Sequence, residues 1–354
     1  MNRLHVIIPA GGVGSRLWPL SRKDRPKFLL DLRMSGKSLL QETIDRLAPI
    51  AASFTIVTGR AHEQAVRAQI PQGLDVTVLV EPQGRDSMPA IGLAAYVIRQ
   101  RFGDEAPIAS FAADHAITHP QVLLDCVERA LEVAQKGYVV TIGLRPLTPS
   151  TAYGYIAPGE PFEKESPEKG SIVRSFVEKP DEETAKHYCE QGYLWNAGMF
   201  IMTAGTLTRA LTRFHPDMDT HLSAIGSQWE SEDFAKTLSE EWPALTKIAI
   251  DHAVAEPLAS EGGVAVVPAT DMGWTDVGDF DALAQISSEG QALRIDSPDS
   301  FVRSLTGQKI VLVGAPNVAV IATEDAILVV DRNRAQDVKH VVDQLTQRGE
   351  GELL

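Results

Sequence analysis

The sequence is poor in cysteine and contains no long apolar run. Two cysteines, Cys126 and Cys189, are too few for a disulfide framework. No apolar stretch approaches the ~18 residues that a membrane-spanning helix requires. The short apolar run at residues 5–10 leads into glycines without a small-residue cleavage site, which favours a first strand over a signal peptide. We therefore expect a cytoplasmic protein without a membrane partner.

Positive charge is also scarce. Asp and Glu number 47 against 33 Lys and Arg, which gives a formal net charge of −14. Such an acidic chain is a poor binder of nucleic acid or of anionic membranes, so a polyanionic substrate would need a locally basic cleft or a metal. The 44% of hydrophobic residues is ordinary for a globular protein, and 354 residues suggest two domains or one large α/β domain with an appendage.

Short apolar runs alternate with helical patterns over the first 145 residues. Strands are expected at residues 5–10, 54–58, 76–80, 108–112 and 139–142. A helix should begin with capping-box spacing at Ser38 and Gln41, and further helices are expected at 89–99 and along a stripe made of Leu124, Val127, Leu131 and Ala134. This alternation predicts an α/β fold: a Rossmann-like, mixed, mostly parallel sheet flanked by helices.

The pattern changes after residue 145. Residues 160–169 are expected to form an exposed loop, and residues 192–202 and 264–268 to form strands. Short strands at 310–313, 318–321 and 326–330 indicate stacked hairpins or a β-helix turn, and a helix should follow at 331–348. We predict a large domain over residues 1–290 and a small C-terminal β/helix domain over 291–354, with a loose boundary in the polar stretch 285–300.

The strongest local signal is the sequence PAGGVGSRLWPL at residues 9–20, which is followed by Lys27. Three glycines directly after a strand allow successive backbone N–H groups to face an anion. The loop lacks the Gly-Lys-Ser/Thr of a Walker A motif, and Arg16 stands near the third glycine of a dinucleotide fingerprint. Arg16 and Lys27 instead supply two cations, which suit a triphosphate. The glycines alone could equally form a tight turn; the longer string through Lys27 favours phosphate binding.

Six further motifs follow the glycine loop. They are Glu81-Pro82 with Arg85, then ADH at 113–115, YGYI at 153–156, FVEKP at 176–180, WNAGMF at 195–200 and DMGWTDVG at 271–278. With the glycine loop they make nearly the whole chain resemble the sugar-nucleotide pyrophosphorylases. The LWPLSR extension at 17–22 resembles that of the mannose-1-phosphate guanylyltransferases within this group. Each motif alone is weak to moderate evidence for the family, whereas seven motifs in the family's order are specific evidence for it.

The resemblance implies an activity and a set of site residues. The activity is nucleotidyl transfer from GTP to α-D-mannose 1-phosphate, which yields GDP-mannose and pyrophosphate. It implies catalytic roles for Arg16, Lys27, Asp114 and Asp276, with Asp114 and Asp276 also holding Mg²⁺. The implied nucleotide-binding residues are Gly11, Gly12, Gly14, Ser15, Arg16, Lys27, Glu81 and Arg85, and the implied sugar-phosphate residues are Gly154, Glu178, Lys179, Asn196 and Asp251.

The residue types agree with these roles to different degrees. Asp114 follows a predicted strand, and in open α/β sheets ligands bind outside the carboxyl ends of the strands. Two carboxylates together with substrate phosphates are a usual way to hold Mg²⁺. A lone Asp more often caps a turn, and Glu178 with Lys179 would by itself be a surface ion pair. The resemblance favours the site in each case. We assign no chemical role to His115 and interpret Trp195 and Trp274 as core aromatics.

The expected mechanism is an in-line displacement that needs no general base, because a phosphate monoester with a second pKa of about 6 is already ionised. The alternatives are a pyrophosphorylase for another sugar 1-phosphate or nucleotide, such as GDP-heptose or a dTDP- or UDP-hexose, and a non-catalytic regulatory paralogue. The chain departs from the family pattern at residues 86–88 and 252–257. The roughly 60 residues after position 290 are too few for an eight-stranded cupin barrel, so no isomerase activity is expected. The sequence does not determine the oligomeric state; we predict a homo-oligomer, a dimer.

Overall fold

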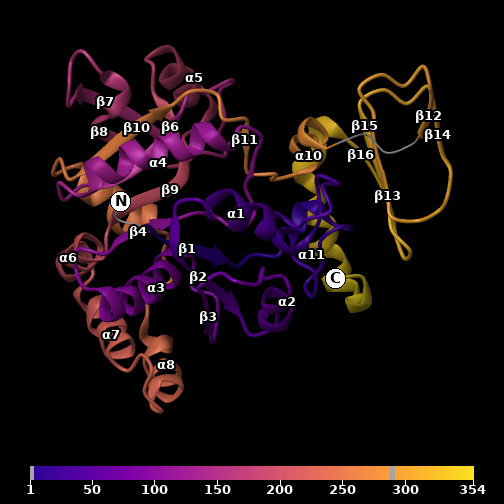
Figure 1. Cartoon of the computed structure of the whole chain (residues 1–354). Helices are drawn as coiled ribbons and strands as arrows, with labels where there is room; N and C mark the ends of the chain where they lie inside the picture. Colours follow the sequence, from indigo (N-terminus) through magenta and orange to yellow (C-terminus); the bar gives the residue numbers. More distant parts are fainter. Residues whose placement is uncertain (1–3, 288–291) are drawn as a thin grey trace.

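The computed structural model describes residues 4–287 and 292–354, and a nine-stranded sheet forms its centre (Figure 1). The strand order is β3-β2-β1-β4-β9-β6-β10-β8-β7. The bounds are β1 Leu4–Ala10, β2 Ala51–Gly59, β3 Val76–Glu81, β4 Pro107–Ser110, β6 Val139–Leu144, β7 Tyr155–Pro161, β8 Ser171–Val177, β9 Leu194–Thr203 and β10 Val264–Ala269. Strands β8 and β9 run against the other seven. The predicted mixed, mostly parallel sheet is confirmed.

Helices cover both faces of this sheet, and strand β1 shows why. Ile7 belongs to one hydrophobic cluster, whereas Val6 and Ile8 belong to another, as expected for side chains that alternate across a buried strand. The first cluster includes α3 (Ser87–Phe102), α6 (Ala204–Phe214), α7 (Pro216–Ser227), α8 (Phe234–Glu241) and α9 (Glu256–Ala259). The second includes α1 (Leu39–Leu47), α2 (Glu63–Ala68), α4 (Pro120–Ala134) and α5 (Glu182–Glu190).

The local predictions in the first half are largely confirmed. Ser38 Oγ accepts a hydrogen bond from Gln41 N at 3.2 Å, and Gln41 Oε1 accepts one from Ser38 N at 3.0 Å, so α1 begins with a capping box. The predicted stripe of α4 is wrong in part, because Leu124 and Leu131 are half-buried while Leu123 and Cys126 are fully buried. Helix α4 packs against β6, β9 and β10, so its buried face is wider than one stripe.

The second half departs further from the sequence-based expectation. Strand β7 extends to Pro161, so Glu160 belongs to a strand and the loop begins later than residue 160. Helices α5, α6, α7 and α8 lie where no helix was predicted. Strand β9 is inserted antiparallel between β4 and β6, although it follows both in the chain. Neither the helices' packing partners nor this insertion has a local sequence signal.

The C-terminal lobe is a short β-helix. Strand β12 (Ala292–Ile295) pairs in parallel with β14 (Ile310–Val313), and β13 (Phe301–Ser304) pairs in parallel with β15 (Val318–Ala322). Strand β16 (Ile327–Asp331) then turns back antiparallel on β15. Parallel stacking of successive turns supports the β-helix alternative. Strands β12 and β13 were not predicted, and β12 begins inside the polar stretch 285–300. Residues 288–291 of that stretch lie outside the described residues.

The predicted last helix is present, with a 3₁₀ segment (Arg332–Asp337) before α11 (Val338–Arg348). A third hydrophobic cluster joins this helix and α10 (Phe280–Ile286) to the segment after the glycine loop, and its members include Leu17, Phe280, Val338 and Leu345. Arg22 strengthens the connection, because it donates to the carbonyl of Leu353 and forms an ion pair with Asp325 at 2.8 Å. The LWPLSR extension therefore contacts the C-terminal part of the chain.

Candidate functional site

The glycine loop lies immediately after β1 and is shaped by Lys27. Gly12 and Gly14 have φ angles of 82° and 76°, a left-handed conformation that favours glycine. A Cβ atom at Gly14 would lie 2.7 Å from Lys27 Cβ, which is too close for a side chain. Ser21 Oγ donates to the Gly14 carbonyl at 2.6 Å and fixes the loop from the other side. Gly11 and Gly12 are exposed, so their backbone is accessible to a ligand.

Lys27 is a buried cation between the two predicted metal ligands. Its residue is 7% exposed, and its Nζ lies 2.5 Å from Asp114 Oδ2 and donates to the Asp276 carbonyl oxygen at 2.6 Å. Burial would raise the pKa of Asp114, but the charges of Lys27 and His115 outweigh it and lower that pKa. Asp114 is therefore held as a carboxylate beside the glycine loop.

Asp276 is oriented by a tyrosine to which the sequence analysis gave no role. Asp276 Oδ1 accepts hydrogen bonds from Tyr153 Oη at 3.2 Å and from Gly278 N at 3.1 Å. The Tyr153 ring packs edge-on against Trp195 and Trp274, with centroid distances of 4.9 and 5.2 Å. Burial, together with Asp276, raises the pKa of Tyr153 and keeps its hydroxyl a donor. The YGYI motif contained the signal for this residue, but only the fold shows its partner.

The donor set at this position fits a divalent ion that substrate oxygens complete. Within residues 4–287 and 292–354, no three or more His, Cys, Asp or Glu side chains are grouped so that they could hold a metal ion. Asp114 and Asp276 supply two carboxylates: that of Asp114 lies beside the ammonium of Lys27, which also binds the backbone carbonyl of Asp276. Mg²⁺ is typically bound through one or two carboxylates with phosphate and water in the other positions. The arrangement is consistent with the predicted metal ligands.

The predicted sugar-phosphate residues form a second cluster, built around Asn196. Asn196 Nδ2 donates to Asp251 Oδ1 at 2.8 Å, and its backbone N donates to the Gly154 carbonyl at 2.8 Å. A Cβ atom at Gly154 would overlap the carboxylate of Glu178. Lys179 Nζ lies 2.6 Å from Glu178 Oε1. The fold thus brings together five residues from four separate sequence segments.

This second cluster differs from the first in its charge state. The pKa of Asp251 is raised to about 6, mainly by burial and secondly by the negative charge of the nearby Glu178. Asn196 is buried and also accepts a hydrogen bond from Thr141 Oγ1 at 2.9 Å. Hydrogen-bonding groups of this kind suit sugar hydroxyls. Tyr153 and Gly154 are adjacent in the chain, so the two clusters are directly connected.

The predicted nucleotide-binding residues beyond the loop are placed unequally. Glu81 ends β3 with 8% of its surface exposed, and burial raises its pKa to about 7. Its Oε1 lies 4.0 Å from the position of a Cβ on Gly11, and its buried Oε2 has no hydrogen-bond partner among the described residues. Arg85 instead donates to the Leu245 carbonyl. Arg16 is exposed, and no described residue forms a hydrogen bond or ion pair with it, so the predicted pairing of Arg16 with Lys27 is not preformed.

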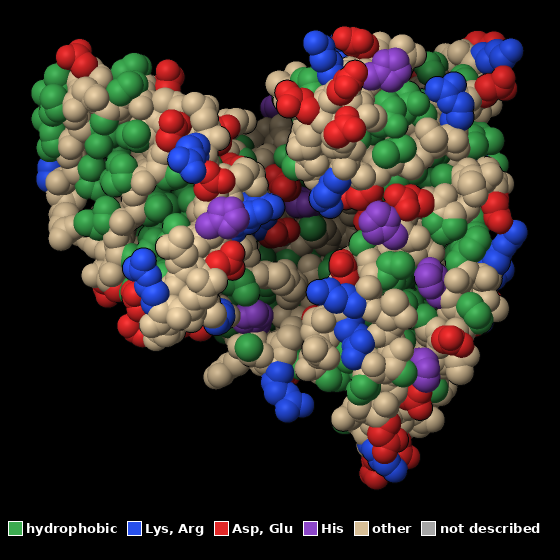
Figure 2. Space-filling view, turned by 180° about the vertical axis from the view of Figure 1, so that it is seen from behind, with side chains coloured by type: hydrophobic (Ala, Val, Ile, Leu, Met, Phe, Trp, Pro, Cys, Tyr) green, Lys and Arg blue, Asp and Glu red, His purple; other side chains and the backbone are tan. Residues whose placement is uncertain are grey.

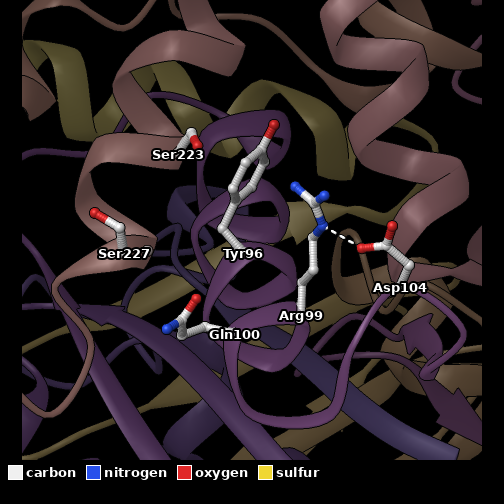
Figure 3. Close-up of a pocket in the computed structure, with 7 residues that line it drawn as sticks. Tyr96, Arg99, Gln100, Asp104, Ser223 and Ser227 are labelled. Carbon is white, nitrogen blue, oxygen red and sulfur yellow. Dashed lines mark hydrogen bonds and ion pairs between the residues drawn. The ribbon is translucent and has the colours of Figure 1, made fainter.

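Two cavities, among several in the described part of the chain, lie outside these clusters. One, of about 320 Å³, lies between α3 and α7 and is lined by Tyr96, Arg99, Gln100, Asp104, Ser223, Gly226 and Ser227 (Figure 3). Arg99 is already paired with Asp104 at 2.5 Å there. The other, of about 500 Å³, lies beside Arg22 and Asp325. Neither contains a predicted site residue. Figure 2 shows a separate hollow between the β-helix lobe and the larger domain, where acidic, basic and histidine side chains gather.

Comparisons with known proteins agree with the sequence motifs. Residues 5–292 match the family model described as nucleotidyl transferase, and residues 290–345 match a MannoseP isomerase/GMP-like beta-helix domain. The chain is 36% identical to a mannose-1-phosphate guanylyltransferase of Salmonella muenchen and 35% identical to one of Escherichia coli (strain K12), in both cases over 99% of this chain and 75% of the relative. A solved structure from Thermus thermophilus, named mannose-1-phosphate geranyltransferase, has a TM-score of 0.83 and 31% identity, and the match covers 98% of this chain and 100% of that one. No helix in the described part of the chain is long and apolar enough to cross a membrane.

Proposed function

The chain belongs to the nucleotidyl transferase family, and we propose that it transfers the guanylyl group of GTP to α-D-mannose 1-phosphate, yielding GDP-mannose and pyrophosphate. The choice of substrates rests on the relatives, which are named mannose-1-phosphate guanylyltransferases and align over 99% of the chain. The reaction class rests on one observation: the buried Lys27 ammonium lies between Asp114 and the Asp276 backbone, directly under the glycine loop. This fixes one cation, paired with the Asp114 carboxylate, beside the loop where a triphosphate would lie.

Each cluster then has a part in binding. The backbone of Gly11, Gly12, Gly14 and Ser15 would face the triphosphate, with Arg16 turning toward it from solvent. Glu81, whose buried Oε2 is unpartnered among the described residues, would accept hydrogen bonds from the base, and Arg85 would support the same loop. The second cluster would bind mannose 1-phosphate, with Glu178, Asn196 and Asp251 on the hydroxyls, the Gly154 backbone close to the ring and Lys179 on the phosphate.

The chemistry requires alignment and charge neutralisation. A phosphate oxygen of the sugar phosphate forms a bond to the α-phosphorus of GTP, and the bond from that phosphorus to the bridging oxygen breaks, with the electron pair leaving on pyrophosphate. The attacking phosphate is already ionised, so no side chain has to remove a proton. A divalent ion, which we propose to be Mg²⁺ held by Asp114 and Asp276, supplies positive charge to the phosphates. Lys27 and Arg16 would stabilise the departing pyrophosphate.

We extend the proposal to organisation and location. The catalytic unit would span residues 1–290 and the small C-terminal unit residues 291–354, with the cytoplasm as the compartment. The packing of α11 against the segment that follows the glycine loop supports a C-terminal unit that stabilises the nucleotide site.

The test is a matrix of nucleoside triphosphates against sugar 1-phosphates, with pyrophosphate release as the readout and Mg²⁺ present. GTP with mannose 1-phosphate should give the highest kcat/KM, and the product should have the mass of GDP-mannose. Asp276→Asn serves as the matched inactive control. Better turnover with another pair, such as a heptose phosphate or UTP, would overturn the substrate assignment. No turnover with any pair would support a non-catalytic paralogue.

A further inference from the structure

The two predicted metal ligands flank a short ribbon that stands apart from the nine-stranded sheet. Strand β5 (Ala116–Ile117) pairs antiparallel with β11 (Trp274–Thr275) in a two-stranded sheet of its own. Asp114 lies two residues before β5, and Asp276 directly follows β11. In an antiparallel pair the chain that enters one strand lies beside the chain that leaves the other. The ribbon therefore determines how far apart the two carboxylates are held.

Backbone hydrogen bonds continue the ribbon on the side away from the carboxylates. Thr118 N donates to the Gly273 carbonyl at 3.2 Å, and His119 N donates to the Met272 carbonyl at 3.0 Å. Gly273 has a φ angle of 60°, and a Cβ atom there would overlap Thr118 Oγ1, so the close approach of the two segments requires glycine. On the side toward the carboxylates, side chains connect the two segments.

Trp274 is the side chain that contacts the surroundings of both carboxylates. Its Nε1 donates to His115 Nδ1 at 3.2 Å, and the two rings meet edge to face with their centroids 5.3 Å apart. His115 follows Asp114 in the chain. The same indole packs edge-on against Tyr153 at 5.2 Å, and the Tyr153 hydroxyl donates to Asp276 Oδ1 at 3.2 Å. A continuous series of contacts thus joins one predicted metal ligand to the other.

These contacts differ from those of the core aromatic that the sequence suggested at position 274. Trp274 is only half-buried, and its indole N–H is bound to a histidine. An indole N–H only donates, so Nδ1 of His115 must accept, which fixes the orientation of the imidazole ring. Arg46 of α1 holds the same turn, because its guanidinium donates to Thr43 Oγ1 at 2.8 Å and to the His115 carbonyl at 3.5 Å. Side chains from two distant elements therefore fix the turn that carries Asp114.

We propose that Trp274 and His115 are positioning residues for the divalent ion: their hydrogen bond holds Asp114 and Asp276 at a separation at which both can bind one ion together with substrate phosphate. The inference rests on the proposed function, because it takes these two carboxylates as the metal ligands. Mg²⁺ demands near-ideal octahedral geometry, so a small change in the separation of its ligands lowers its affinity. Loss of a group that orients metal ligands typically costs about 10–100-fold in metal affinity.

The first experiment measures metal binding without catalysis. Mn²⁺ replaces Mg²⁺, and free Mn²⁺ is followed by electron paramagnetic resonance with the full chain and GTP, in the absence of any sugar phosphate. Trp274→Phe keeps a ring beside Tyr153 and loses the N–H, and His115→Leu loses the acceptor. Each should raise the dissociation constant for Mn²⁺ by about tenfold or more. The double variant should be no weaker than the weaker single variant, because both remove the same hydrogen bond.

Two further variants separate positioning from packing. Trp195→Phe is the matched control, since Trp195 packs against the same Tyr153 ring at 4.9 Å but is not hydrogen-bonded to His115, and it should leave the Mn²⁺ affinity unchanged. His115→Asn should restore most of the affinity that His115→Leu loses, because its amide oxygen can accept from Trp274 in place of Nδ1. Melting temperatures check folding; a merely structural role would lower them without changing the Mn²⁺ affinity.

The inference and the proposed function fail in different ways. Asp276→Asn should lose tight Mn²⁺ binding whatever the role of Trp274. If it does, while Trp274→Phe and His115→Leu bind Mn²⁺ as the wild type does, the positioning role is overturned and the metal ligands stand. The role is also overturned if Trp195→Phe weakens Mn²⁺ binding as much as Trp274→Phe. If Asp276→Asn binds Mn²⁺ normally, the metal assignment of the proposed function is wrong, and the positioning role is overturned with it.

Discussion

Two lysines were predicted to bind phosphate, and the structure gives them opposite environments. Lys27 is 7% exposed and has two fixed partners, Asp114 Oδ2 at 2.5 Å and the Asp276 carbonyl at 2.6 Å. The Lys179 side chain is 63% exposed, and it pairs with its chain neighbour Glu178 at 2.6 Å. An exposed pair of this kind contributes at most about 1 kcal/mol and is easily exchanged for a ligand contact. The glycine-loop side is thus preorganised, whereas the sugar-phosphate side would take its final form with the ligand.

The carboxyl groups follow the same division. The pKa of Asp114 is lowered through the nearby Lys27 and His115 despite its burial, so it is ready to bind a cation. The pKa of Asp251 is raised to about 6 by burial and by Glu178, so it is partly protonated in mild acid. The side with Asp114 favours fixed charge, as binding of phosphate and a metal ion requires. The side with Asp251 favours hydrogen bonding, as binding of a sugar requires.

The largest effect is expected from removing charge on the preorganised side. Asp276→Asn and Asp114→Asn should each lower kcat by at least ~10²–10³-fold, because an amide is a poor ligand for Mg²⁺ and the loss acts on charge that develops in the transition state. The measurement is pyrophosphate release during a titration with Mg²⁺, together with the melting temperature as a check of folding. If either variant keeps near-normal activity at low Mg²⁺, that residue is not a metal ligand.

The next prediction separates the two lysines. Lys27→Ala should mainly lower kcat, because its charge is fixed where pyrophosphate departs, and Lys179→Ala should raise the KM for mannose 1-phosphate more than the KM for GTP. Steady-state kinetics with each substrate varied in turn distinguishes these outcomes. Lys27→Met is the matched control, since it keeps the aliphatic packing against Gly14 and loses the ammonium.

Arg16 sharpens the same comparison. Arg16 is exposed and forms no hydrogen bond or ion pair with any described residue, so it would act together with Lys27 only when a triphosphate binds. If the two act as one unit on pyrophosphate, Arg16→Ala should resemble Lys27→Ala in kinetics, and the double variant should be less impaired than the product of the single effects. Identical profiles for the Lys27 and Lys179 variants, with both KM values raised alike, would contradict the division between the two sides.

The parts of this site that could be predicted from the sequence are those with local signals. The glycines and Lys27 lie within 17 residues of each other, and the Ser38–Gln41 capping box is complete within one helical turn. Strands such as β1 and β6 are short apolar runs that are buried on both faces. In these cases the residues that determine the structure are neighbours in the chain, and the predicted elements are confirmed within a few residues.

The parts that could not be predicted depend on distant partners. Lys27 meets Asp276 across 249 residues, and Tyr153 meets the same residue across 123 residues, so neither contact has a local pattern. Strand β9 lies between two strands that precede it, and helices α6, α7 and α8 pack against α3 and against one another, so their burial depends on segments far away in the sequence. Strands β12 and β13 were not predicted because each has only four residues and polar neighbours in the sequence; the side chains of β12 alternate between half-buried and exposed positions, whereas three of the four in β13 are buried.

A smaller effect is expected from crowding the sugar side. A methyl group at Gly154 would overlap the Glu178 carboxylate and lie 3.4 Å from Asn196 Cβ. Gly154→Ala should therefore displace Glu178 and raise the KM for mannose 1-phosphate by on the order of tenfold, the cost of about one hydrogen bond, with little change in the KM for GTP. Gly84→Ala, where a Cβ would lie 3.8 Å from Glu81 Oε1, is the control on the nucleotide side. A change confined to GTP binding in the Gly154 variant would place this residue on the wrong side of the site.

The smallest expected effect concerns stability and the carboxyl of Asp251. Its pKa is raised to about 6 from an ordinary value of 3.8, so the folded state binds this proton more tightly than the unfolded state. The resulting stabilisation is complete below pH 3.8 and is lost as the pH rises through about 6. Lowering the pH from 7 to 5 should therefore stabilise wild-type protein relative to Asp251→Asn, by on the order of 1 kcal/mol.

Denaturant melts of both proteins at pH 5 and pH 7 give this difference, and because all other groups titrate alike in both, the comparison isolates Asp251. Asp181→Asn is the matched control: the pKa of Asp181 is lowered by its hydrogen bonds from Thr184, so it is ionised throughout this range in both the folded and the unfolded state. Its variant should show the wild-type dependence on pH between 5 and 7. If Asp251→Asn also shows that dependence unchanged, Asp251 is already ionised at pH 5, and the contrast in charge between the two halves of the site reduces to the contrast between Lys27 and Lys179.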